Sequence, residues 1–184
     1  MRRNDVTAAA DIYIFWSIHM ARIEKFNDYP QVNLTASVGK GGVNYDDDVL
    51  AVQALMKYAF EGERGWEGYK FPTPTGTLCA ATRSLIKRYQ RVIKRTISSA
   101  KVDGRIDPAK GTFPAGSRVM WTILSLNTDA MTTWLFSKRM GANYIHAVGM
   151  MFPEFKSAIG DRGVGSLNLE LDGGGVGSLG LELE

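Results

Sequence analysis

The residues with side chains suited to catalysis are two histidines, one cysteine and a few clustered carboxylates. His19 and His146 lie far apart in the sequence, and neither belongs to an HxxE or HExxH motif, in which zinc ligands are closely spaced. Cys79 has neither a CxxC partner nor a nearby histidine to activate its thiolate. The sequence therefore predicts no zinc site, no cysteine nucleophile, no other metal and no cofactor.

Paired carboxylates are the remaining catalytic candidates, because glycosidases use two of them. Asp46, Asp47 and Asp48 are consecutive, and Glu61 and Glu63 follow in a later segment. The aspartates stand where the positive end of a helix dipole favours negative charge, and the glutamates stand in a polar loop. The structural interpretation is the stronger one, so we expect no catalytic residues and a protein that is not an enzyme.

The composition is that of a folded globular protein. The chain has 184 residues, of which 45% are hydrophobic and 22% charged, with a formal net charge of +3. The single cysteine excludes an intramolecular disulfide. No run of eighteen apolar residues predicts a membrane span, and the charged residues around the apolar run at residues 12–16 do not fit a signal peptide. Cytoplasmic, envelope and secreted locations all stay open.

The elements that must position these residues begin with an expected helix at residues 6–26, where apolar and aromatic side chains recur near helical spacing. The segment at residues 32–38 alternates apolar and polar residues and is expected to be extended. The expected helix and the start of this segment form an N-terminal region of residues 1–36. A GKGG turn follows. Asn44 or Asp46 is expected to cap the next helix, in which Val49, Val52, Leu55, Met56 and Phe60 form an apolar stripe.

Three further helical segments are predicted beyond a long loop. The loop, residues 61–75, is rich in glycine, proline and aromatic residues. A helix at residues 77–96 has a basic side, and another is expected at residues 117–136. Residues 137–162 form an additional helical element that Pro153 interrupts.

The C-terminal segment is an internal repeat. Residues 163–172 read GVGSLNLELD and residues 175–184 read GVGSLGLELE, and this alternation predicts a two-stranded β-hairpin tail over residues 163–184. An isolated hairpin is marginal in water, so its apolar face must pack on the domain or on another chain. The leucines expected to bind a partner are Leu167, Leu169, Leu171, Leu179, Leu181 and Leu183. We expect the partner to be another protein chain, either a different protein or a second copy of this one.

Three ordered fragments carry a resemblance to a known family. The first is DDDVLAVQALM from Asp46, with its Val-Gln pair. The second contains Thr82, Ile86 and a Tyr-Gln pair, and the third is DGRIDP from Asp103, followed by a segment from Trp121 to Asn127. Together they resemble the peptidoglycan-binding-domain-like superfamily of three-helix modules. The resemblance covers roughly residues 37–127 and implies a mainly α fold, with a compact bundle of that type in a domain of residues 37–136. The N-terminal helix and the C-terminal hairpin predicted above are additions to that bundle.

A ligand groove is expected from four residues near the long loop and the Asp-Gly turn. These are Trp66, Tyr69, Arg105 and Trp121. Aromatic faces stack on sugars or peptides, and arginine binds a carboxylate through two hydrogen bonds. The alternative is that Trp121 belongs to the core and Trp66 covers it.

Two functional hypotheses follow. The first is a noncatalytic structural or adaptor protein of a bacterial assembly, such as a secretion or contractile injection apparatus. The second, which the resemblance implies, is a module that binds peptidoglycan, with a wall hydrolase or secreted effector less favoured. Nucleic acid is not an expected partner, because the basic helix side has no accompanying base-stacking motif and GKGG lacks the GK[ST] ending of a phosphate loop.

Overall fold

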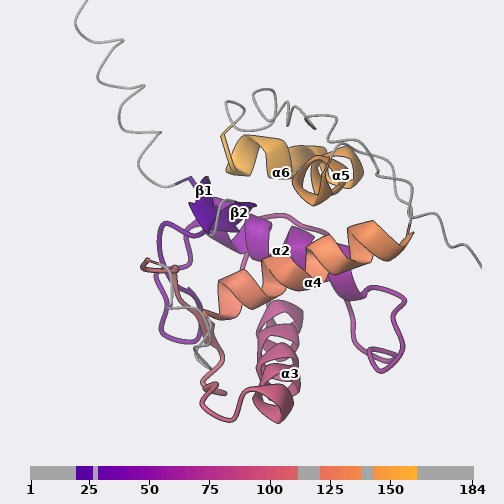
Figure 1. Ribbon diagram of the computed structural model, residues 1–184. Coiled ribbons are helices and arrows are strands. Elements are labelled where there is room, and N and C mark those ends of the chain that lie inside the picture. The colour runs from indigo at the N-terminus through magenta and orange to yellow at the C-terminus, as the bar shows by residue number, and fades with distance from the viewer. Residues whose placement is uncertain (1–19, 27–28, 112–120, 138–142, 161–184) are drawn as a thin grey trace, which may run out of the picture.

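The computed structural model describes residues 20–26, 29–111, 121–137 and 143–160. About half of these residues are helical, so the fold is mainly α as expected (Figure 1). In chain order the elements are β1 (Arg22–Phe26), β2 (Tyr29–Asn33), β3 (Val38–Gly39), α2 (Asp46–Phe60), α3 (Ala80–Thr96), β4 (Arg105–Ile106), α4 (Thr122–Ser137), α5 (Tyr144–Met151) and α6 (Pro153–Ala158).

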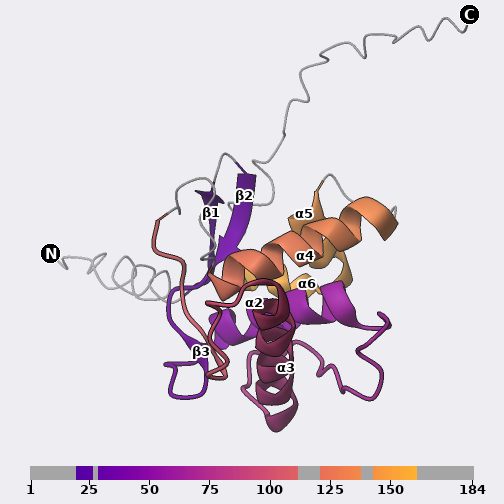
Figure 2. The ribbon, with the colours of Figure 1, turned by 60° about the horizontal axis from the view of Figure 1, so that its bottom comes forward.

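The described helices are arranged around a central pair, α2 and α4, which pack against each other. α5 and α6 lie on one side of this pair, and α3 extends from the other side (Figure 1). β1 and β2 lie at one end of α4, and the loop that follows α2 lies at the other end (Figure 2). One cluster of buried apolar side chains joins these elements, from Ala21 to Ile159.

The expected N-terminal helix is wrong in the part that the structure describes. Arg22–Phe26 is a strand that pairs antiparallel with Tyr29–Asn33, from Arg22 opposite Asn33 to Phe26 opposite Tyr29. The pairing satisfies the backbone and buries Phe26 against the core, and this tertiary gain outweighs the local helical pattern. The rest of the expected helix, residues 6–19, lies outside the described residues, as does the C-terminal hairpin of residues 163–184.

The two predicted turns, GKGG and Asp-Gly, meet in space. Val38 pairs with Ile106 and Gly39 with Arg105, and the Lys40 N–H donates to the Gly104 carbonyl over 2.8 Å. Gly39 has a φ of 111°, and a Cβ there would lie 2.2 Å from the Gly104 oxygen. Only glycine fits this close approach between the two segments.

Asn44 does not cap α2, contrary to the expectation, and Asp46 is already inside the helix. The cap position is Tyr45, with no side-chain hydrogen bond to the helix. The Asn44 side chain folds back on the glycine turn instead, accepting from the Gly39 N–H and donating to the Gly42 carbonyl, each over 2.6 Å. Both of its polar groups are therefore used before the helix begins. The three aspartates do lie in the first turn, as expected.

The apolar stripe of α2 is confirmed, since all of its members are buried except Phe60, which is half-buried. α3 begins at Ala80, where the Cys79 sulfur accepts from the Thr82 N–H as the helix cap. The interruption at Pro153 is also confirmed, because α5 ends at Met151 and Pro153 starts α6.

Two buried glutamines connect α2 and α3 to neighbouring segments of the chain. The Gln53 amide donates to Thr77 and Thr82, and its oxygen accepts from the backbone of Thr75 and Gly76. Gln90 binds the Asp-Gly turn in the same way, through Asp103, Gly104 and Arg105. These are the glutamines of the Val-Gln and Tyr-Gln pairs, and their side chains have an architectural role.

Candidate functional site

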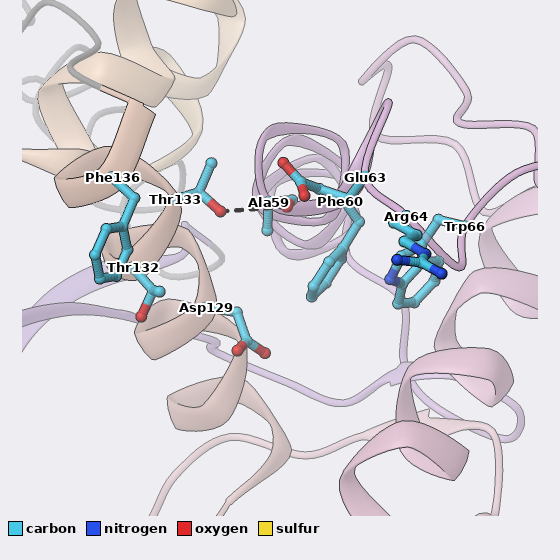
Figure 3. Close-up of a pocket in the computed structure, with 9 residues that line it drawn as sticks. All are labelled: Ala59, Phe60, Glu63, Arg64, Trp66, Asp129, Thr132, Thr133 and Phe136. Atoms are coloured by element: carbon cyan, nitrogen blue, oxygen red, sulfur yellow. Dashed lines mark hydrogen bonds between the residues drawn. The ribbon is translucent and has the colours of Figure 1, made fainter.

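A cavity of about 450 Å³ lies between the end of α2, the loop that follows it and α4 (Figure 3). We call it the Asp129 cavity. Its walls combine aromatic rings, two threonine hydroxyls, two carboxylates and one guanidinium. The lining residues are Ala59, Phe60, Glu63, Arg64, Trp66, Asp129, Thr132, Thr133 and Phe136.

Asp129 is the half-buried charged residue of this cavity, and Tyr89 of α3 forms a hydrogen bond to its carboxylate. The Tyr89 hydroxyl donates to Asp129 Oδ2 over 2.5 Å. Burial, followed by the charge of Asp129, raises the pKa of Tyr89 far above its ordinary value, so the phenol keeps the proton that it donates. This hydrogen bond fixes one oxygen of the carboxylate and therefore the orientation of the other.

The second oxygen of Asp129 has no protein partner within the described part of the chain. Its hydrogen bonds there are limited to the one from Tyr89, and none of the ion pairs includes it. Burial raises the pKa of Asp129, which outweighs the lowering caused by the Tyr89 hydrogen bond. A carboxylate oxygen that lines a cavity without a partner is available to accept a hydrogen bond from a ligand.

The aromatic wall of the cavity is packed from behind. The Phe60 and Trp66 rings stack with centroids 4.4 Å apart, and Tyr69 meets Trp66 edge-on at 5.8 Å. The Arg88 guanidinium carbon lies 5.7 Å from the centroids of both Trp66 and Tyr69, and Arg88 also donates to the Gly65 carbonyl. Trp66 is only 7% exposed, so it forms a rigid wall and does not offer a free stacking face.

Consecutive turns in the loop after α2 place these residues. The Glu63 N–H donates to the Phe60 carbonyl, the Trp66 N–H to the Glu63 carbonyl and the Tyr69 N–H to the Trp66 carbonyl. Each turn contains a glycine with φ between 79° and 89°, at every third position of the sequence EGERGWEGY. The result turns Trp66 inward and leaves Glu63 and Arg64 exposed at the rim of the cavity.

The structure does not bring the four expected ligand residues into one groove. Trp66 and Tyr69 pack beside Arg88, whereas Arg105 and Trp121 line a second cavity of about 340 Å³ beside Gln90. Positions 88 and 90 of α3 are about 200° apart around the helix, so the two cavities lie on different sides of it. Trp66 therefore covers Phe60, and not Trp121.

The second cavity, which we call the Trp121 cavity, has its arginine already paired. Arg105 Nε lies 2.8 Å from Asp107 Oδ1, which also accepts from the Ser37 hydroxyl over 2.6 Å. The cavity also contains Lys101 and Asp103, so its charges are mixed. A ligand carboxylate would have to compete with Asp107 for Arg105.

The sequence analysis missed Asp129, although a signal was present. Asp129 is the single ionisable residue of α4, whose sequence is TILSLNTDAMTTWLFS. It therefore has no opposite charge three or four positions away on its own helix. An isolated charge in an otherwise apolar and polar neutral helix needs a partner from elsewhere, and here that partner is Tyr89.

The remaining expectations concern metals, membranes and the tail. No group of three or more metal-binding side chains occurs within residues 20–26, 29–111, 121–137 and 143–160. None of the helices in those ranges is long and apolar enough to cross a membrane. The six tail leucines, from Leu167 to Leu183, lie outside the described residues. Comparisons with protein-family models, with curated proteins and with solved structures find no match for this chain.

Proposed function

We propose that this protein is a noncatalytic adaptor that binds a segment of another polypeptide in the Asp129 cavity. The observation that carries the proposal is the cavity itself, in which a fixed carboxylate with a free oxygen lies among aromatic walls. The helical module that the sequence resembles would serve as the scaffold for this contact.

The surface around the cavity supports a protein partner. Phe136 lines the cavity and is 84% exposed, and its neighbour Leu135 is 59% exposed. Large apolar side chains exposed beside a concave site are typical of surfaces that another protein covers. A polypeptide would bury them while its polar groups meet Asp129 and the threonine hydroxyls.

The lining favours binding over catalysis. Among the described residues that line the cavity there is no histidine, cysteine or lysine to act as nucleophile or base. Its two carboxylates are Asp129 and Glu63, and Glu63 is exposed on the loop. A glycosidase needs two carboxyl groups held at a defined separation, which an exposed loop side chain does not provide.

The tail would supply a second contact in a larger bacterial assembly, such as a secretion or contractile injection apparatus. Its repeated LxLEL segments, within residues 163–184, are predicted to be strands and would add to a sheet of another chain. Comparing the oligomeric state of the full chain with that of a chain ending at residue 162 tests this part. A monodisperse monomer in both cases contradicts it.

Selection of binding peptides tests the cavity directly. A displayed library of random peptides is panned on the immobilised protein, and the winners are measured on Thr132→Trp, which fills the cavity mouth. Glu154→Trp, an exposed position on α6 outside the lining, is the matched control. We expect peptides that bind the wild type and the control but not Thr132→Trp. If no peptide makes this distinction, the adaptor function is wrong.

Peptidoglycan binding is the second candidate, and the Trp121 cavity is the observation that favours it. Trp121 and Arg105 share that cavity with polar side chains, a combination suited to sugar rings and carboxylates. Purified protein is incubated with insoluble wall sacculi, and the pelleted fraction is compared between wild type and Arg105→Gln. If the pelleted fraction of the wild type at moderate salt is no larger than that of an unrelated protein, peptidoglycan binding is wrong.

A further inference from the structure

We infer that the group bound by Asp129 is a primary ammonium, presented by a lysine side chain of the partner polypeptide. The inference rests on the proposed adaptor function and names the chemistry that the cavity selects. It follows from three features of the described residues: the charge of the cavity, the single free oxygen of Asp129 and the nature of its neighbours.

The net negative charge of the lining favours a cationic ligand. Two of its side chains, Asp129 and Glu63, are acidic, and Arg64 is its one basic residue. Arg64 is exposed on the loop that follows α2 and makes no ion pair with Asp129 (Figure 3). Arg88, the nearby cation of α3, is held by the Gly65 carbonyl and the aromatic rings. Asp129 therefore lacks a counter-charge from any described element packed against it.

The single free oxygen favours ammonium over guanidinium. Arginine binds a carboxylate best through two parallel hydrogen bonds, one to each oxygen. The Tyr89 hydroxyl already donates to Oδ2 of Asp129, so a guanidinium could reach both oxygens only by sharing Oδ2 with the phenol, whereas Oδ1 is unshared among the described residues. An ammonium group is a compact charge that needs only one carboxylate oxygen and can turn its other two donors elsewhere.

The neighbouring groups suit the rest of a lysine side chain. The Thr133 hydroxyl donates to the Ala59 carbonyl, so its lone pairs are free to accept, and Thr132 also lines the cavity. Phe60 and Phe136 provide apolar surface for the methylene stem. An ammonium at Asp129 would also be close to the aromatic wall, which attracts cations.

Small probes test this chemistry on the full chain. Amide shifts in NMR spectra follow titration with n-butylammonium, n-butylguanidinium and neutral n-pentanol. We expect saturable shifts at Asp129 and Phe60 with butylammonium, weaker binding of butylguanidinium and none of pentanol. Asp129→Asn keeps an acceptor for Tyr89 but removes the charge, and should weaken butylammonium binding about tenfold or more. Glu154→Gln, an exposed carboxylate on α6, should bind like the wild type.

Tyr89→Phe tests the preference for ammonium over guanidinium, which would not change if Tyr89 had only a structural role. The change removes the hydroxyl while keeping the ring, so a guanidinium no longer shares Oδ2 with the phenol. We expect the preference for butylammonium over butylguanidinium to fall or reverse in this variant. An unchanged preference contradicts the argument that sharing Oδ2 with Tyr89 disfavours guanidinium.

The outcomes separate this inference from the function on which it rests. Cavity-dependent peptides that lack lysine, or that bind Asp129→Asn as well as wild type, overturn the ammonium inference and leave the adaptor function standing. Butylammonium binding without any cavity-dependent peptide overturns the adaptor function, and with it the partner lysine, and leaves only the preference of Asp129 for an ammonium group. Equal binding of pentanol and butylammonium to the wild type overturns the inference outright.

Discussion

Asp48 and Asp129 are two shielded aspartates that differ in how many of their carboxylate oxygens the protein binds. Asp48 is fully buried in the first turn of α2, and its two oxygens accept from the backbone N–H groups of Thr35 and Ala36 over 2.8 and 2.7 Å. Asp129 has one oxygen bound to Tyr89 and one open to a cavity. In both cases burial raises the pKa of the carboxyl group.

The difference separates an architectural carboxylate from a candidate binding carboxylate. A buried polar group whose bonding capacity is filled by the protein holds chain segments together, and removing it leaves its partners unsatisfied. A buried charge that the protein leaves half-satisfied weakens the fold and is available to a ligand. Gln53 and Gln90 belong with Asp48 in the first class, and the Asp129 cavity represents the second.

The largest expected effect is at Gln53. Gln53→Leu should lower the free energy of unfolding by about 3 kcal/mol or more, because it strands the Thr75 and Gly76 N–H groups and the Thr77 carbonyl. Urea unfolding followed by circular dichroism measures the loss. The matched control is Gln31→Leu, since Gln31 Oε1 is buried without a partner among the described residues. Similar losses in both variants would contradict the distinction.

The next effect is the pH dependence that Asp48 contributes. Burial is the main cause that raises its pKa from 3.8 to about 6. The folded state then binds the proton more tightly than the unfolded state. Stability from this group is thus complete below about pH 4 and is lost as the pH rises to about 6, a change on the order of 3 kcal/mol.

Asp48→Asn isolates this contribution because asparagine does not titrate. Urea unfolding from about pH 3.5 to 7 measures the free energy of unfolding of both proteins. As the pH rises, the wild type should lose stability relative to Asp48→Asn. A difference that stays constant over this range is the result that contradicts a raised pKa at Asp48.

Asp129→Asn should have a smaller effect on stability than Gln53→Leu, and one of the opposite sign. The raised pKa means that the ionised form of Asp129 costs stability once the pH is above its folded value. At pH 8 the neutral asparagine should therefore leave the protein as stable as wild type or more stable, by less than about 1 kcal/mol. Thermal unfolding at pH 8 measures it. A clear loss of stability would place Asp129 with Asp48 among the architectural residues.

The smallest effect on stability is expected at the cavity mouth. Phe136→Ser should change the free energy of unfolding by less than about 0.5 kcal/mol, because the ring is 84% exposed. The same variant should weaken binding of cavity-dependent peptides, measured by fluorescence anisotropy. Met151→Ser removes another exposed apolar side chain outside the lining and should leave peptide binding unchanged. Equal effects of the two variants would remove Phe136 from the binding surface.

Much of the helical architecture is predictable from the sequence. The acidic start and apolar stripe of α2 and the break at Pro153 are local signals, and the structure confirms them. The strand at Arg22–Phe26 was missed because its partner strand, and not its own pattern, decides its conformation. Asn44 was misassigned because its bonds to the glycine turn exclude it from capping the helix.

The candidate site was less predictable, for a geometric reason. The sequence predicted one groove containing Trp66 and Trp121. In the structure Trp66 packs on Arg88, and Trp121 shares a cavity with Gln90, on a different side of α3. Which side each tryptophan reaches depends on the helical positions of Arg88 and Gln90 and on the paths of the loops. Asp129 could have been noticed as the single charge of α4. That its second oxygen stays free depends on Tyr89 and the cavity, which come from segments distant in sequence.

The most direct test of the account is the titration of the Asp129 carboxyl carbon by NMR, with and without n-butylammonium, and with Asp48 as the internal reference. We predict that the free protein shows a raised pKa at both aspartates. Saturating butylammonium should lower the pKa of Asp129, because the bound cation stabilises the ionised form, and leave the pKa of Asp48 unchanged. An unchanged pKa at Asp129, or an equal shift at both aspartates, would contradict the central claim.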